Sequence, residues 1–357
     1  MRAIGTQAQE PGPLAVRMDG ERLVGPPGPN PAGDPREAGV KATSGRARGK
    51  FLAPVGQALA TAAAVIILTF VMVRAIPGDP VVALTGSRSS EQVRAELRHE
   101  LHLDESLPAQ FGLYLEDLAH GDLGQSLVQG QKSVASVIAD SLPVTGVLVL
   151  VTALISCLVG LPLGLLAGSR ETRWLDGPIR TLLTVLLATP PFLCGLVLIL
   201  LVSLDLGWLP AGGWPDSWPQ NFEYLLLPAL ALAAYLTPLI ARATRQACID
   251  SLAEPWAEAA VARGMPSGRL ARTLVLRRCA VPVVTVLAFN LGVLVSGAVV
   301  VEAVFGLPGI GTELVNAIRF RDYPVVQGIA LVSALAVIFC NLAADYAVEL
   351  LDPRARR

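Results

Sequence analysis

The chain has 357 residues, of which 53% are hydrophobic and only 16% charged, and its formal net charge at pH 7 is −1. Soluble globular domains carry roughly 25% charged residues, so this composition excludes an ordinary soluble protein and predicts an integral membrane protein. Nothing in the charge balance points to nucleic acid as a partner.

The first 50 residues are rich in proline, glycine and charge, and they contain too few apolar side chains to form a core. We expect residues 1–50 to be a disordered cytoplasmic extension. A true start at Met18 or later is an equally plain explanation for this segment.

Six apolar segments follow, each long enough to cross about 30 Å of hydrocarbon. They lie near residues 54–76, 142–168, 180–204, 225–241, 281–301 and 325–348. The expected fold class is therefore an all-α integral membrane protein with six transmembrane helices. The expected domains after the extension are 51–140 (first helix and an extracytoplasmic loop), 141–352 (a five-helix core) and 353–357 (a cytoplasmic tail).

The expected loop begins after Pro77-Gly78-Asp79-Pro80, where two prolines force an extended exit from the first helix. Residues 81–140 are acidic on balance and apolar enough to fold back on the membrane surface. We expect this segment to lie outside the cytoplasm, with Ser126 accessible from that side.

Small residues recur every four positions in two of the spans. Gly160, Gly164 and Gly168 form such a ridge in the second span, and Gly292 and Ser296 form a shorter one in the fifth. Ridges of this kind let neighbouring helices approach closely, so helix packing explains them better than a direct role in transport.

Positive charge is concentrated in the connection 242–280, whereas no Lys or Arg lies between Asp205 and Glu223. The arginines of this connection are Arg242, Arg245, Arg263, Arg269, Arg272, Arg277 and Arg278. By the positive-inside rule the 242–280 connection is cytoplasmic, as is the basic tail. An even number of spans then places the N-terminus in the cytoplasm too.

The same connection contains Glu258-Ala259-Ala260, followed after three residues by Gly264. Pro255 suits the first turn of a helix, and glycine after the last turn is a common stop signal. The pattern predicts a short helix over 255–263 with small side chains that another protein could approach closely. A solvated amphipathic loop helix explains the residues equally well.

Signatures of catalysis or metal binding are missing from the sequence. Gly130-Gln131-Lys132-Ser133 lacks the spacing of a nucleotide-binding loop, and His99 and His102 lie three residues apart where a zinc-protease helix needs four. The five cysteines fall in apolar spans or in the cytoplasmic connection, so we expect no disulfide framework. We expect no metal and no cofactor bound by this chain, which is not an enzyme.

Asn290 is the most notable polar residue within a span, because an amide in hydrocarbon needs a partner or water. It borders a substrate path together with Ser296, or it has a structural role. Both interpretations remain open from the sequence.

Taken together, these motifs resemble the membrane subunits of the dipeptide, oligopeptide and nickel permease family of ABC importers, from about Ala58 to Arg356. The residues that carry the resemblance are Ile76-Pro77-Gly78-Asp79-Pro80, Gly121-Asp122-Leu123-Gly124, Glu258-Ala259-Ala260-x3-Gly264, Pro282-Val283-Val284-Thr285, Glu302-x2-Phe305-x2-Pro308-Gly309-x-Gly311, Arg321-Asp322-Tyr323-Pro324, and Asn341-x3-Asp345 leading to Asp352-Pro353-Arg354.

The resemblance implies a type I ABC importer permease fold in the plasma membrane of a prokaryote. It implies four partners: a second permease subunit in a heterodimer, two ATPase subunits that bind ATP and Mg, and an extracytoplasmic solute-binding protein. Glu258, Ala259, Ala260 and Gly264 would couple this chain to an ATPase subunit. Peptides are the implied substrate, with nickel chelates or glutathione as the alternative.

Overall fold

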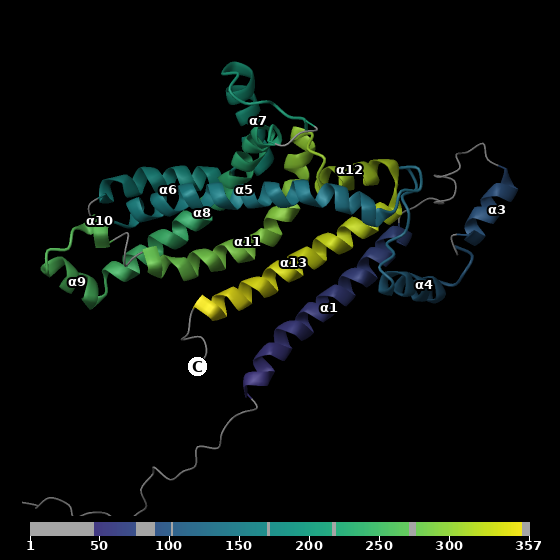
Figure 1. Cartoon of the computed structure of the whole chain (residues 1–357), viewed down its shortest axis with the longest axis horizontal. Helices are drawn as coiled ribbons and strands as arrows, with labels where there is room; N and C mark the ends of the chain where they lie inside the picture. The colour runs from purple at the N-terminus through teal and green to yellow at the C-terminus, as the bar shows by residue number, and fades with distance from the viewer. Residues whose placement is uncertain are drawn as a thin grey trace, which may run out of the picture. The chain divides into compact units, whose positions relative to one another are not determined.

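The structure is a computed structural model that describes residues 46–75, 90–100, 103–169, 172–215, 219–270 and 276–351. Apart from one isolated bridge between Gln125 and Ser133, the regular structure of these ranges is helical (Figure 1). The helices are α1 (Arg46–Ala75), α3 (Glu91–Glu100), α4 (Leu107–Ala119), α5 (Val134–Gly168), α6 (Arg173–Ala188), α7 (Pro191–Leu198), η2 (Ile199–Asp205), α8 (Asn221–Leu252), α9 (Pro255–Ala262), α10 (Ser267–Leu270), α11 (Leu276–Phe305), α12 (Ile310–Phe320) and α13 (Tyr323–Leu351). Of the expected extension 1–50, residues 1–45 lie outside these ranges, as do the Pro77–Pro80 exit and the tail 353–357, whereas residues 46–50 already belong to α1.

Four helices are long and apolar enough to cross a membrane. They are Val134–Gly168, Asn221–Leu252, Arg278–Phe305 and Tyr323–Ala343, and a bent pair, Trp174–Ala188 with Pro191–Asp205, makes a fifth if it counts as one span. The apolar part of α1 is the shorter stretch Gly56–Met72. An all-helical, multi-pass membrane protein is therefore confirmed, with four or five spans by these criteria.

The segment 180–204, expected as one spanning helix, is not continuous, because the chain bends by 103° between α6 and α7. Pro190 and Pro191 are consecutive, so two backbone N–H groups that would continue the helix are missing. Pro190 adopts φ −57° and ψ 139°, which ends α6 and lets Pro191 open α7. Helix α7 continues directly into the π-helix η2, which ends at Asp205.

Two other boundaries differ from expectation. The helix α5 already begins at Val134, inside the expected loop 81–140. The helix α8 continues to Leu252 and α11 begins at Leu276, so the 242–280 connection is largely helical at both ends. Residues next to apolar spans can extend a helix, because its ladder of backbone hydrogen bonds does not depend on hydropathy.

The glycine ridge of α5 packs directly on a neighbouring helix, as predicted, and that helix is α8. A Cβ atom on Gly160 would lie 3.0 Å from the Cβ of Ile240, and one on Gly164 would lie 2.6 Å from the carbonyl oxygen of Ala241. A Cβ on Gly168 would lie 2.8 Å from the Cβ of Cys248. Positions increase together along both helices, so α5 and α8 are parallel.

The central helix of the bundle is α8. Of its most apolar stretch, 67% is buried, against 39% for α5 and 33% for α11 and α13. The main core joins it to α5 and α11, and includes Leu148, Leu225, Leu232, Leu236, Ile240, Leu294, Val301 and Phe305. A second apolar cluster gathers the start of α5, α12 and the start of α13.

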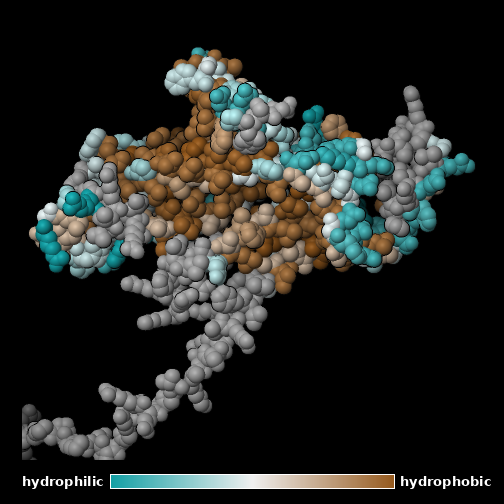
Figure 2. Space-filling view, viewed as in Figure 1, coloured by the Kyte–Doolittle hydropathy of each residue, from teal (hydrophilic) through white to brown (hydrophobic). Residues whose placement is uncertain are grey.

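Hydrophilic residues gather at the two ends of the bundle, while its flank is apolar (Figure 2). We call these the α9 end, formed by α9 and α10, and the α12 end, formed by α12, residues 121–133 and the start of α5 (Figure 1). At the latter, α4 folds back on α1, since Nε of Arg74 donates to Gln110 at 2.8 Å and the rings of Phe70 and Phe111 lie 4.9 Å apart. Ser126 is fully buried there, so the expectation that it is accessible is wrong.

Candidate functional site

The short helix α9 spans Pro255–Ala262, one residue shorter than the predicted 255–263, and backbone hydrogen bonds close its C-terminal end. Pro255 occupies its first turn, where a missing N–H costs nothing. Gly264 adopts φ +79°, and its N–H donates to the carbonyl of Val261 at 2.9 Å while that of Met265 donates to Ala260 at 3.1 Å. This pair of bonds is a Schellman motif, which terminates the helix sharply.

The two faces of α9 differ from the expected arrangement. Ala257 and Ala260 are 1% and 8% exposed and face the protein, whereas Glu258, Ala259 and Ala262 are exposed. Of the residues expected to contact an ATPase subunit, Ala260 is therefore covered by this chain itself. The spacing of three puts these two alanines on one face of the helix, but it does not say that this face is the buried one.

Arg278 of α11 contacts both residues that flank the start of α9. Its guanidinium lies 3.6 Å from the carboxylate of Glu254 and 4.8 Å from the ring centre of Trp256. The ion pair and the cation–π contact join α9 to the first turns of α11. Sequence reasoning missed this contact, since nothing local links residues more than twenty positions apart.

A second ion pair joins α6 to α8 near this end of the bundle. Nε and Nη2 of Arg245 donate to the two carboxylate oxygens of Asp176 at 2.7 and 2.8 Å. Bidentate pairs of this kind fix orientation as well as distance. Arg242 lies one turn earlier in α8 and donates to Thr184 of α6 at 3.2 Å.

Asn290 lies between α11 and α8 with both ends of its amide bonded. Its Nδ2 donates to the carbonyl of Val286 at 2.8 Å, and the hydroxyl of Tyr235 donates to its Oδ1 at 3.2 Å. It is 7% exposed. Ser296 is exposed and donates weakly to Gly292 at 3.5 Å, so the structure does not bring these two residues together.

Gly292 has a packing role of its own. A Cβ atom there would lie 2.8 Å from the side chain of Val337, so α11 and α13 approach closely at this position. The predicted small pair Gly292 and Ser296 thus packs through its glycine.

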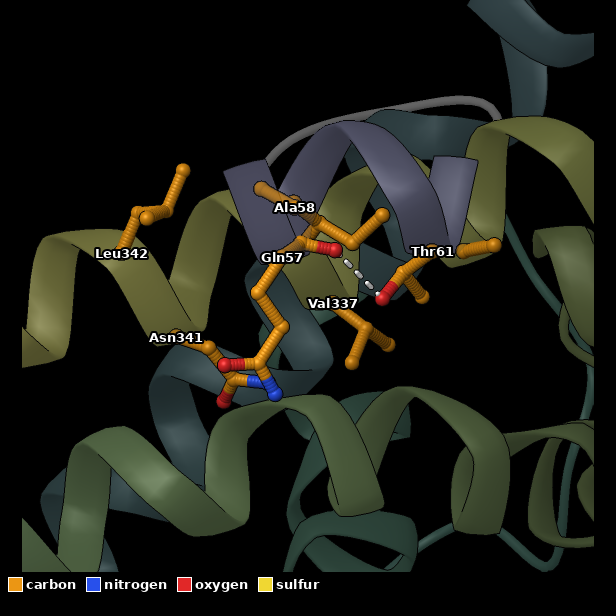
Figure 3. A pocket seen from close by; sticks show the side chains of 8 residues that line it. Gln57, Ala58, Thr61, Val337, Asn341 and Leu342 are labelled. Carbon is orange, nitrogen blue, oxygen red and sulfur yellow. Dashed lines mark hydrogen bonds between the residues drawn. The ribbon is translucent and has the colours of Figure 1, made fainter. Parts of the chain in front are cut away.

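Two of the grooves on the described part of the bundle lie beside its long helices. One of about 450 Å³ is bounded by α5, α6, α7 and α8, and it is almost wholly apolar apart from Thr189, Cys194 and Thr237. The other, of about 420 Å³, lies between α1 and α13 and is lined by the amides of Gln57 and Asn341 (Figure 3). Neither groove includes Asn290 or Ser296.

Within the described ranges, no group of three or more His, Cys, Asp or Glu side chains could hold a metal ion. The five cysteines, Cys157, Cys194, Cys248, Cys279 and Cys340, are free thiols.

The apolar spans and the hydrophilic ends define a multi-pass membrane protein. Comparison with family models identifies it further: residues 160–357 match the binding-protein-dependent transport system inner membrane component, and residues 51–149 match the N-terminal part of such membrane components. The chain belongs to this family of transport-system membrane subunits.

Two relatives are similar over most of their length. The protein named "Probable D,D-dipeptide transport system permease protein DdpB" of Escherichia coli (strain K12) is 35% identical over 83% of this chain and 94% of its own. The glutathione transport system permease protein GsiC of Salmonella choleraesuis (strain SC-B67) is 35% identical over 82% of this chain and 94% of its own.

Among solved structures, an inward-facing conformation of the MetNI methionine ABC transporter matches with a TM-score of 0.51 and 18% identity, over 61% of this chain and 97% of that chain. At this identity the likeness concerns the fold alone.

Proposed function

We propose that the chain is the permease subunit of an ATP-driven importer for peptides and that α9 is the element through which ATPase subunits drive it. The observation that carries the proposal is α9 itself. It is a short helix with a sharp C-terminal stop at the more basic end of the bundle, and it exposes Glu258, Ala259 and Ala262 together with Val261, which is 57% exposed. A short helix of this shape suits a groove on another protein.

The proposed topology has six transmembrane helices, with α1 and the bent α6–α7 pair as the first and third. The arginines near the α9 end support a cytoplasmic position for it by the positive-inside rule, and six spans would put both termini on that side. The α12 end and the loop that follows α1 then face outward. The cell membrane of a prokaryote is the proposed location.

The proposed assembly has five parts. This chain and a second, different permease subunit form the path, two ATPase subunits bind ATP and Mg, and an extracytoplasmic solute-binding protein delivers the substrate. The family description, which names a binding-protein-dependent system, supports the last partner. Closure of the ATPase subunits would move α9 as a rigid body and rock the bundle between inward- and outward-facing states.

Peptides are the proposed substrate class, and glutathione is the second candidate. The D,D-dipeptide and glutathione permeases are equally similar to this chain, at 35% identity each. Since glutathione is itself a tripeptide, one path of moderate width could serve both. Along that path we place Asn290 and Ser296 of α11, the first as a buried amide and the second as an exposed hydroxyl.

Reconstitution tests the proposal. The two permease subunits, the ATPase subunits and the binding protein would be placed in lipid vesicles, and ATP-dependent uptake of labelled dipeptides, longer peptides, glutathione and a nickel chelate would be measured. We expect uptake of at least one peptide that needs both ATP and the binding protein. Uptake of none of the peptides, with the nickel chelate transported, would overturn the substrate class.

A further inference from the structure

Two buried carboxylates hold α12, one at each of its ends. The first is Glu302, near the end of α11, which is 0% exposed. The hydroxyl of Thr145 in α5 donates to its Oε1 at 2.6 Å, and the backbone N–H of Gly311 donates to its Oε2 at 2.7 Å. The N–H of Ile310 donates in turn to the hydroxyl of Thr145 at 2.9 Å. Glu302 and Thr145 therefore jointly satisfy the first N–H groups of α12, where negative charge is favoured.

The glycines after Glu302 make room for this carboxylate. A Cβ atom on Gly309 would collide with the carboxylate of Glu302, and one on Gly311 would lie 2.8 Å from its Oε2 and collide with the backbone of Val299. One structural feature therefore explains the motif Glu302-x2-Phe305-x2-Pro308-Gly309-x-Gly311. It is a carboxylate enclosed by the turn that follows it.

The second carboxylate belongs to Asp322, at the other end of α12, and is 2% exposed. It accepts hydrogen bonds from the hydroxyl of Ser126 and from the backbone N–H groups of Leu127 and Val128, the latter two at 3.1 and 3.4 Å. Ser126 is itself fully buried and lies in a hairpin closed by its own N–H donating to the carbonyl of Lys132 at 2.8 Å.

Between the two carboxylates, α12 is packed on apolar side chains. The cluster comprises Val134, Val137 and Ile138 of α5, Ile310 and Ala317 of α12, and Val325, Val326 and Ile329 of α13. A Cβ on Gly328 of α13 would lie 2.5 Å from Val134, so the start of α13 approaches α5 without a gap. This cluster is separate from the main core of the bundle.

Opening either contact during transport would be costly. Glu302 and Thr145 are 157 residues apart in the chain, and Asp322 and Ser126 are 196 apart, so the contacts join elements that could otherwise separate. Removing one donor from a buried carboxylate leaves its charge with fewer hydrogen bonds, which costs more than the loss of a bond between neutral groups. A conformational change that broke either contact would require this free energy in every transport cycle.

We propose that Glu302 and Asp322 are positioning residues that keep α12, the 124–133 hairpin and the start of α5 together as one rigid unit throughout the transport cycle. The proposal rests on the transport function proposed above. Motion driven from α9 would then reach the α12 end as a displacement of this whole unit, and the path would open beside the unit and not through it.

Distance measurements by electron paramagnetic resonance test the proposal. Nitroxide labels would be attached to ketone side chains encoded at Val128 and Ile318, which are 50% and 58% exposed, so that the native cysteines stay in place. The assembled complex would be measured without nucleotide and trapped with ATP. We expect one narrow distance that is unchanged between the two states, and a change in that distance would overturn the proposal.

Two substitutions at Thr145 form a matched pair that tests the role of its hydroxyl group. Thr145→Ser keeps the hydroxyl, and we expect parental distances and parental coupling. Thr145→Val has nearly the same shape but removes the donor. The loss of one bond to a buried charge should raise the population of the separated arrangement about tenfold, so we expect a broadened distance and more ATP hydrolysed per molecule transported. A role in folding alone would lower hydrolysis and transport in parallel.

Equal behaviour of the two Thr145 variants would also overturn the proposal. Ser126→Ala against Ser126→Thr repeats the comparison at the other carboxylate, in case Thr145→Val fails to assemble. The distance measurement needs only nucleotide cycling, so it tests the rigid unit even if the cargo proves not to be a peptide.

Discussion

Replacing Gly164 by alanine should force α5 and α8 apart. The added Cβ would lie 2.6 Å from both the carbonyl oxygen of Ala241 and the Cβ of Thr244, while ordinary contacts begin at 3.4 Å. The helices must therefore separate locally by about 0.8 Å, the difference between those two distances. A gap of that size forfeits about a quarter to a half of the dispersion energy of the atoms along the seam.

Gly146→Ala is the matched control on the same helix. No atom lies within 4 Å of a Cβ at Gly146, which is exposed. Both substitutions gain the same helix propensity, so the difference between them isolates the packing cost, which overpacking data put at about 1–3 kcal/mol.

The measurement is the free energy of unfolding of the purified subunit, obtained by SDS titration in mixed micelles. We expect Gly164→Ala to be less stable than Gly146→Ala by that amount and to support less uptake in the assembled importer. Equal stability of the two variants would refute the reasoning, since it would mean that the seam can relax at no cost.

Gly264→Val should weaken co-purification with the ATPase subunits and reduce uptake, because a β-branched residue resists φ +79° and the left-handed backbone costs it about 1–2 kcal/mol. Gly264→Asn should have a milder effect. Parental behaviour of the valine variant would contradict the assignment of α9. Asn290→Leu leaves the hydroxyl of Tyr235 without its acceptor. A path role predicts a stable complex with altered uptake across peptides of different size, whereas a packing role predicts lower stability with unaltered preference, which Tyr235→Phe should then reproduce. A cysteine at Val128 should react with a membrane-impermeant thiol reagent added outside, whereas one at Ser126, fully buried, should not; labelling of Val128→Cys only after the membrane is opened would reverse the proposed topology.

Local chemistry explains what could be predicted along the chain. The limits of α9 follow from Pro255 and Gly264, because helix caps depend on residues within one turn of each end. The α5 ridge was predictable because Gly160, Gly164 and Gly168 recur at the helix period, although the sequence does not name α8 as their partner. The bend at Pro190 could also have been predicted from the two consecutive prolines, but the span was assigned from its average hydropathy alone.

The sequence by itself determined that this protein resides in a membrane, which segments are apolar, and where its short surface helix begins and ends. Only the tertiary structure decided that Ala260 faces inward and that the hydroxyl of Tyr235 donates a hydrogen bond to Asn290. It also decided that Glu302 and Asp322 each accept a hydrogen bond from a hydroxyl group of a distant segment. The physical reason is range: apolar periodicity and helix caps act within a few residues, whereas a buried polar group depends on whichever donor the fold brings to it.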